Sequence, residues 1–250
     1  MLLNIIYRLT VKILKKYVSI LLITAMMFTS PFSVWANTTD ISTEKVVNSV
    51  KNSLHVDYKL EQDTVIEISS FTDVDNEYVE MWRSVEKDGS GKLIYTKANK
   101  SFTIELSDQD YDLFVSLLNA PMTNQARGDD IGSDITGSQY KHIYMSSQTA
   151  TLNNSAMSQI IQGGIGTATS IIVGMISTPA GIAVSIASFI YSAILTLSPS
   201  KITVDQSLYE VRLTYDDAYY THCYHEIIKS YDSGGHLVDT TKMYKQAIGS

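Results

Sequence analysis

The residues best suited to bind a metal ion stand almost side by side near the C-terminus, at His222, Cys223, His225 and Glu226. Side chains of a β-strand alternate between its two faces, so Cys223 and His225 would share one face and His222 and Glu226 the other. A zinc site needs about three or four converging ligands, and neither face offers them. We therefore expect a half-exposed strand with a partly buried thiol here, and no metal site.

The acidic segment 73–77 (DVDNE) resembles part of a calcium-binding loop. Counted from Asp73, the EF-hand pattern requires glycine at its sixth position, where Tyr78 stands, and a bidentate glutamate at its last, where Ser84 stands. The pattern therefore favours a solvated turn over a cation site.

A polar loop at 119–138 carries two further features. Arg127, Gly128 and Asp129 form an integrin-like tripeptide, a triplet that arises readily by chance, and Asp129, Asp130 and Asp134 would hold a cation only weakly. Long polar loops are typical sites of motion and of proteolytic cleavage. We expect this segment to be mobile or processed.

Signatures of enzymatic chemistry are missing from the sequence. It has no Gly-x-Ser-x-Gly motif, and neither Cys223 nor any serine lies in a recognisable catalytic pattern. The glycines at 163, 164 and 166 lack the lysine and the preceding strand of a phosphate-binding loop. We expect no enzyme, no catalytic residues and no cofactor.

The dominant feature is a long stretch, residues 143–200, without Asp, Glu, Lys, Arg or His. Its second half predicts two apolar helices, 158–178 and 180–198, broken at Pro179, which lacks an N–H and restricts the preceding residue. Each helix has about the 20 residues that cross a hydrocarbon core. The sequence therefore predicts a helical hairpin able to enter a membrane.

Small residues form a ridge on each predicted helix. Gly166, Ser170, Gly174 and Thr178 fall four apart, and Gly181, Ser185, Ser188 and Ser192 nearly repeat this spacing. Such ridges let helices approach closely in lipid, while the larger apolar residues on the opposite faces would meet lipid or core. We predict that membrane insertion depends on Gly166, Ser170, Gly174, Pro179, Gly181, Ser185, Phe189 and Ser192.

The same pattern fits a hairpin that never leaves the protein, because a helix apolar on all sides is either membrane-spanning or deeply buried. A permanently buried hairpin and one that leaves the core for a membrane are equally compatible with the sequence. A constitutive two-pass anchor is a weaker alternative, because serines, threonines and glycines interrupt the aliphatic runs.

Residues 1–36 have the form of a signal peptide. Arg8, Lys12 and two further lysines precede an apolar run at 17–28, and a cleavage site of small residues ends at Ala36. We expect a secreted protein cleaved after Ala36, with an uncleaved anchor as the alternative. The mature chain would carry 15 − 26 = −11 charges, because four of the 19 basic residues lie in the leader. This charge argues against nucleic-acid partners, and the lone Cys223 excludes an internal disulfide.

Strand patterns surround the hairpin. Segments 64–71 and 78–85 alternate at period two, as do shorter runs up to residue 106 and again from 202 to 244, and the 16 tyrosines suit half-exposed strands. We predict an α+β protein: an antiparallel, β-rich domain with an inserted apolar helical hairpin. It divides into 37–140 (β-rich with short helices), 141–200 (strand and hairpin) and 201–250 (strands that can join 37–140 in one domain).

The leader and the glycine-, alanine- and serine-rich hairpin GGIGTATSIIVGMISTPAGIAVSIASFIYSAILTL (163–197) resemble the large secreted bacteriocins of the geobacillin type. The plan is also similar to that of pore-forming colicins, although colicin hairpins lie in all-helical domains. The resemblance covers about a third of the chain and implies a secreted antibacterial protein that damages a target membrane. Its partners would be membrane lipid or a membrane receptor, and it can form homo-oligomers. The alternative is a cell-envelope binding or structural module, with the hairpin as core and the tyrosine-rich strands at 208–231 as ligand face.

Overall fold

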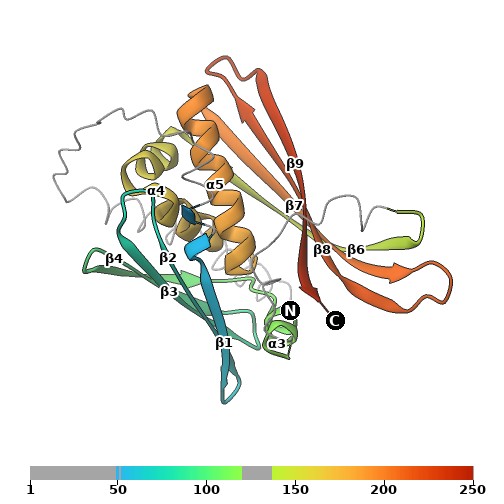
Figure 1. Ribbon diagram of the computed structural model, residues 1–250. Helices are drawn as coiled ribbons and strands as arrows, with labels where there is room; N and C mark the ends of the chain where they lie inside the picture. The colour runs from blue at the N-terminus through green and yellow to red at the C-terminus, as the bar shows by residue number, and fades with distance from the viewer. Residues whose placement is uncertain (1–48, 51, 120–136, 250) are drawn as a thin grey trace, which may run out of the picture.

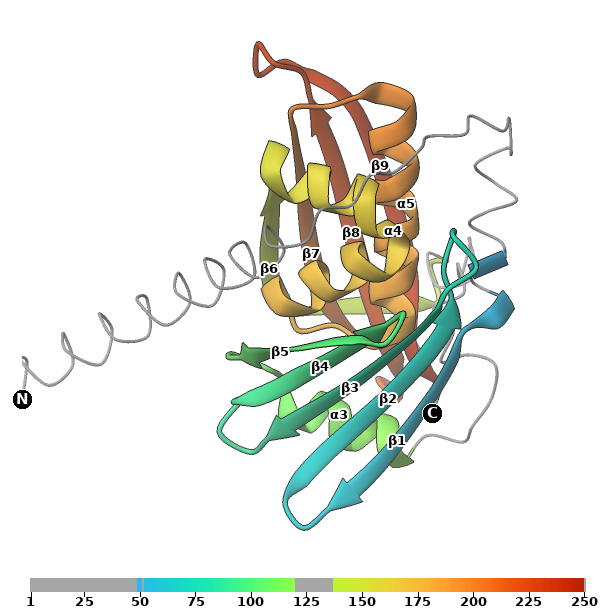
Figure 2. The same ribbon diagram turned by 90° about the vertical axis from the view of Figure 1, so that its left-hand side faces the viewer.

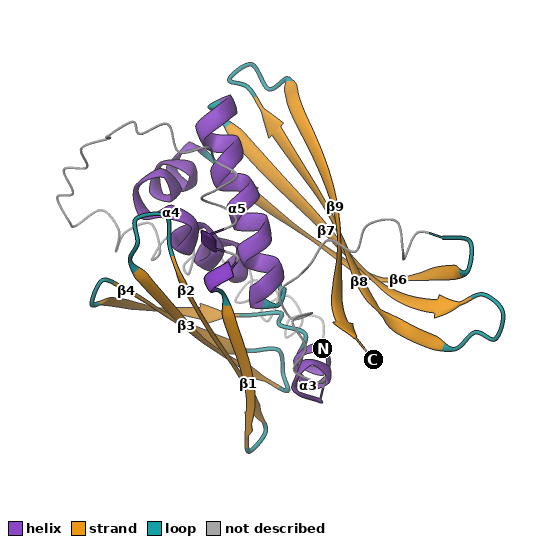
Figure 3. Cartoon of the chain, viewed as in Figure 1, coloured by secondary structure: helices purple, strands orange, loops and turns teal. Residues whose placement is uncertain are grey.

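The computed structural model describes residues 49–50, 52–119 and 137–249, and in this range the protein is α+β, as the sequence predicts. Two antiparallel sheets enclose a helical hairpin (Figure 1, Figure 3). The predicted signal peptide, the Arg127-Gly128-Asp129 tripeptide, Asp130 and Asp134 lie outside the described residues.

The first sheet is a meander in the order β1-β2-β3-β4-β5. Its strands are β1 (His55–Glu61), β2 (Thr64–Thr72), β3 (Tyr78–Glu86), β4 (Gly91–Lys97) and β5 (Lys100–Leu106). Alternate residues of β2 and β3 are buried, so the period-two pattern of the sequence corresponds to one core-facing side. Trp82 and Ile94 pair on the opposite, exposed side.

The second sheet has the order β6-β7-β8-β9, in strands of 13 residues. They are β6 (Tyr140–Leu152), β7 (Lys201–Leu213), β8 (Tyr219–Tyr231) and β9 (Leu237–Gly249). Leu152 at the end of β6 pairs with Ile202 at the start of β7. The whole hairpin is therefore the connection between two neighbouring, paired strands.

Three helices complete the described fold: α3 (Tyr111–Asn119), α4 (Asn154–Met175) and α5 (Ala180–Leu197). α3 begins after Asp110, whose side chain accepts the first-turn N–H of Leu113 at 3.1 Å. Pro179 breaks the hairpin as predicted.

The first arm of the hairpin differs from the prediction of one helix over 158–178. It begins at Asn154, because the Asn153 side chain caps the N–H of Ala156, and it ends at Met175. Gly164 interrupts it with φ 76°, a backbone conformation that suits glycine. The arm is therefore two shorter helical segments joined at Gly164, not one straight rod.

The hairpin lies between the two sheets, and one continuous core joins all three layers (Figure 2). α3 covers another part of the first sheet, with Leu113, Phe114 and Leu117 buried. The hairpin supplies a large share of the buried apolar side chains: Met157, Ile160, Ile165, Ile171, Ile172, Val173, Ile176, Ile182, Val184, Ile186, Ile190 and Ile194.

Candidate functional site

The turn of the hairpin is buried. Ile176, Thr178 and Ala180 are at most 2% exposed. The opposite, open end of the hairpin reaches the surface, where Ile161 and Leu195 are each 52% exposed. The segment that would have to cross a bilayer first is therefore buried in the folded protein.

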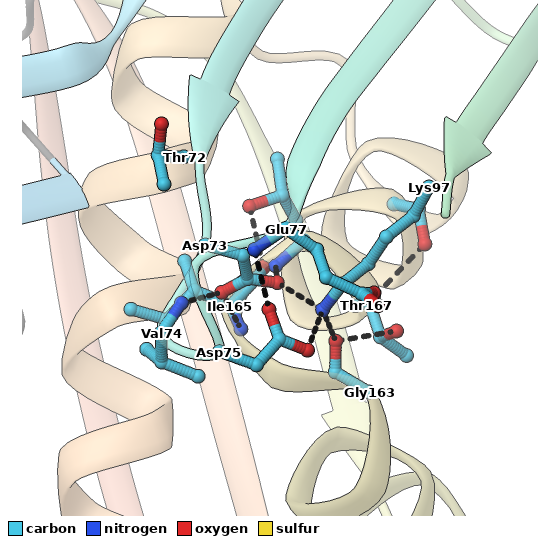
Figure 4. Close-up of polar contacts among 12 residues, drawn as sticks. Thr72, Asp73, Val74, Asp75, Glu77, Lys97, Gly163, Ile165 and Thr167 are labelled. Carbon is cyan, nitrogen blue, oxygen red and sulfur yellow. Dashed lines mark hydrogen bonds and ion pairs between the residues drawn. The ribbon is translucent and has the colours of Figure 1, made fainter. Parts of the chain in front are cut away.

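A buried carboxylate caps the break in α4 (Figure 4). Asp73, directly after β2, accepts the N–H of Ile165 with Oδ1 and the N–H of Gly166 with Oδ2, each at 2.9 Å. These two groups begin the helical segment after Gly164, and an anion at a helix N-terminus is stabilised by free N–H groups and by the helix dipole. The break in α4 is thus bonded to the first sheet.

Lys97, at the end of β4, completes this contact. Its Nζ lies 2.9 Å from Asp73 Oδ2, 2.7 Å from Asp75 Oδ2 and 3.0 Å from the carbonyl oxygen of Gly163. Burial by itself would lower the pKa of Lys97, but the two aspartates outweigh it and the pKa is raised. The ammonium therefore stays charged and binds the last carbonyl before the break. We call Asp73 and Lys97 the break clamp.

A second buried carboxylate holds the start of α5. Glu67 on β2 accepts the N–H of Ala180 with Oε1 at 2.9 Å, and the same oxygen accepts the Tyr58 hydroxyl at 2.7 Å. Its Oε2 accepts a hydrogen bond from Arg83 on β3, whose guanidinium lies 4.3 Å from the centre of the Phe114 ring. Burial, followed by the charge of Glu67, raises the pKa of Tyr58, which therefore remains a donor. We call Glu67 and Arg83 the turn clamp.

The second sheet holds the same turn with neutral groups. Gln148 Oε1 on β6 accepts the N–H of Ser177 at 2.7 Å, and Gln206 Nε2 on β7 donates to Thr178 Oγ1 at 3.1 Å. Gln206 also lies 3.4 Å from Oε1 of Glu226, which is fully buried on β8. Polar side chains from both sheets thus surround the turn.

Charge is distributed unevenly across these contacts. The hairpin has no charged residue, and the ionic groups that hold it, Asp73, Lys97, Glu67 and Arg83, belong to the first sheet or to the turn after β2. They bond mainly to hairpin backbone, at the Gly164 break and at the start of α5, where helical N–H groups have no intrahelical partner. If the hairpin separated from the first sheet, all of these charges would remain with the sheet.

Gly166 and Gly174, on the ridge of small residues of α4, face the first sheet. A Cβ at Gly166 would lie 2.8 Å from the Tyr95 hydroxyl oxygen and 2.9 Å from a methyl carbon of Val79, while the nearest atom to a Cβ at Gly174 is a methyl carbon of Ile104, at 4.0 Å. Close helix–sheet approach therefore explains Gly166 in the folded protein, whereas the sequence suggested close helix–helix approach.

The other residues predicted for insertion fall into two groups. Ser170, Pro179, Gly181 and Ser185 are buried, whereas Phe189 and Ser192 are partly exposed. Ser170 donates its hydroxyl to the carbonyl of Thr167 at 2.9 Å, and the carbonyl of Ser192 accepts the hydroxyl of Thr196, also at 2.9 Å. These two groups are thus bonded within their own helices, as entry into lipid would require, whereas the buried hydroxyl of Ser188 has no hydrogen-bond partner among the described residues.

Residues considered for metal binding do not converge. Cys223 and His225 share the face of Tyr209 and Ser207, as strand pairing shows, and Cys223 is buried. Within residues 49–50, 52–119 and 137–249, no three side chains of His, Cys, Asp or Glu are arranged to hold a metal ion. Asp73, expected in a solvated turn, is instead buried, and no feature of the sequence pointed to its bond with α4.

Among the described helices, α5 is the one long and apolar enough to cross a membrane by length and composition, and 67% of it is buried. α4 does not meet this criterion, in keeping with its glycine break. Comparison of the chain with protein-family models, with curated proteins and with solved structures found no match.

Proposed function

We propose that the protein is a secreted, membrane-active antibacterial protein of the geobacillin type, whose hairpin leaves the space between the sheets and enters a target membrane. The observation that carries the proposal is the placement of charge around the hairpin. α4 and α5 contain no ionisable acid or base, and the ionic groups that hold them stay on the first sheet. Transfer to lipid would therefore carry no charge into the hydrocarbon, where each charge costs about 3 kcal/mol or more.

The position of the hairpin in the chain supports the same proposal. β6 and β7 pair with each other at Leu152 and Ile202, immediately before and after the hairpin. The hairpin can therefore swing out about Asn153 and Ser198 without unpairing a strand of the second sheet. Asn153, in an extended conformation, caps the start of α4. Ser198, in a left-handed conformation, ends α5 just before Pro199, so both ends of the hairpin are sharp boundaries.

The kinked α4 makes a symmetric pair of spanning helices a weaker mechanism than insertion led by α5. α5 is apolar on most sides, and its mean hydropathy over the spanning window is 1.9. We propose that α5 crosses the bilayer first and that the segment of α4 after Gly164 follows it, while Gly164 stays near the interface, because the break leaves backbone groups that need partners.

Release of a trapped dye from liposomes tests the proposal, using the protein without residues 1–36 at pH 7 and pH 5. The informative variant is Gly174→Glu, because Gly174 is partly exposed and has space for a side chain in the folded protein. A charge at buried Ser185 would instead disturb the fold itself. We expect release by the parent protein and by Gly174→Ala, and its loss in Gly174→Glu. Equal release by all three would contradict the proposal.

A cell-envelope binding module is the second candidate, favoured by the outer face of the second sheet. His142, Tyr209 and His225 lie edge to face across β6, β7 and β8, with ring centres 6.1 and 5.4 Å apart, and Tyr144 joins them at 5.9 Å from Tyr209. Tyr144 is 57% exposed, so the row is open to a ligand. A protein that never disturbs liposomes but binds isolated envelope material through this row would establish the second candidate.

A further inference from the structure

The break clamp and the turn clamp bind the hairpin in the same way, through buried ionic groups that an ordinary core helix does not need. Glu67 lies in the middle of β2, and Asp73 follows the last residue of the same strand. The carboxylate of each accepts backbone N–H groups at the start of a helical segment of the hairpin. Each carboxylate also has its own cation, Lys97 or Arg83. One strand of the first sheet therefore holds the hairpin at both of its backbone breaks.

These contacts are strong and local. A buried carboxylate that accepts backbone N–H groups and faces a cation forms charge-assisted hydrogen bonds, about twice as strong as neutral ones. The side chain of Asp73 is 0% exposed and that of Lys97 is 11% exposed, so water competes little for them. Asp75, by contrast, is 44% exposed, and it bonds Lys97.

We infer that Asp73 and Glu67 form an autoinhibitory contact: they keep the hairpin closed between the sheets, and their release is the step that permits insertion. This inference rests on the proposed function for its biological meaning, but the closed state can be measured without a membrane. The first sheet thereby acts as the cover of the hairpin, and the second sheet as its base, to which both ends of the hairpin remain joined.

Hydrogen exchange of the purified protein measures the contact directly. In Asp73→Asn and Glu67→Gln, which keep the shape and remove the charge, we expect amide exchange in 160–182 to rise about tenfold or more, the size expected when a charge-assisted bond is lost. Amides in β7 and β8 should remain better protected than those in 160–182, because the hairpin opens without unpairing these strands. Asp63→Asn, which removes an exposed ion pair with Lys87 on the first sheet, is the matched control and should exchange like the parent protein. Lys97→Gln, which keeps a donor for the Gly163 carbonyl, provides a milder variant should Asp73→Asn fail to fold.

Dye release from liposomes then separates this inference from the proposed function. Faster exchange in the hairpin together with faster release supports both. Faster exchange without any release supports the autoinhibitory contact and contradicts membrane activity. Unchanged exchange in both carboxylate variants, or equal protection of the hairpin and the second sheet in them, would overturn the inference, because the hairpin would then open only when the whole protein unfolds.

Discussion

The carboxylate of Asp73 accepts the backbone N–H of Gly166 at 2.9 Å, although 93 positions separate the two residues in the chain. The contact joins the end of β2 to the helical segment that starts after Gly164. The contact also requires glycine at positions 164 and 166. A Cβ at Gly164 would lie 2.7 Å from Asp73 Oδ2, and a Cβ at Gly166 would lie 3.0 Å from the same atom. Gly164 and Gly166 thus allow the hairpin to bond to the Asp73 carboxylate beside the first sheet.

Gly164→Ala should destabilise the protein by about 2–3 kcal/mol, because φ is +76° and the added methyl group would contact the Asp73 carboxylate. Gly174→Ala is the matched control on the same helix. It has ordinary helical geometry and free space, so we expect an unchanged or slightly higher free energy of unfolding, by up to about 1 kcal/mol. Urea denaturation of both variants checks the prediction, and equal effects would contradict the role of the break.

Glu67→Gln should lower the free energy of unfolding by about 3 kcal/mol, because Arg83, 1% exposed, would keep a buried charge without its anion. The control is Glu105→Gln, whose ion pair with Lys92 is long, at 3.8 Å, and well exposed. We expect a change within about 0.5 kcal/mol for the control. Two variants of similar stability would show that the buried pair does not hold the turn of the hairpin.

Tyr224→Phe should raise stability at pH 7 by about 1 kcal/mol. Tyr224 is fully enclosed on β8, and its hydroxyl has no hydrogen-bond partner among the described residues. Phenylalanine fills the same space without a buried polar atom. A loss of stability on thermal unfolding would mean that the hydroxyl is bonded in solution.

Stability should fall as the pH rises above about 10, the ordinary pKa of tyrosine. Burial raises the pKa of Tyr58 and Tyr224, and nearby carboxylates add to the effect. A phenol with a raised pKa in the folded state contributes fully below its unfolded pKa and loses that contribution as the pH rises towards the folded value. Tyr224→Phe should therefore lose stability less steeply between pH 9 and pH 11 than the parent protein, as measured by denaturation at each pH. Parallel curves would contradict the assignment.

Much of the architecture follows from the sequence, because its cause is local. The period-two alternation of β2 and β3, the break at Pro179 and the uncharged hairpin all depend on neighbouring residues. The fold class depends on the same signals.

The clamps could not be predicted, because they join residues far apart in the chain. Asp73 stands in an acidic turn that looks solvated, and only the tertiary fold brings Ile165 and Gly166 to it. Similarly, nothing near Glu67 indicates that it accepts the N–H of Ala180. The ridge of small residues predicts close helix approach in lipid, whereas in the folded protein Gly166 faces Tyr95 and Val79 of the first sheet. Periodicity identifies a helix face and not the surface packed against it.

A reversible cross-link between the hairpin and the first sheet tests most directly whether the hairpin must leave the core to act on a membrane. A Cβ at Gly174 would lie 4.0 Å from a methyl carbon of Ile104 on β5, so thiols at the two positions can be joined by a short, reducible bis-methanethiosulfonate cross-linker that ties α4 to the first sheet. The pair Gly174→Cys and Ile104→Cys is placed in Cys223→Ser protein, which removes the native thiol. Dye release from liposomes is measured before and after reduction. We expect no release by the cross-linked protein and full release on reduction, whereas equal release in both states, or none in either, would contradict the departure of the hairpin from the core.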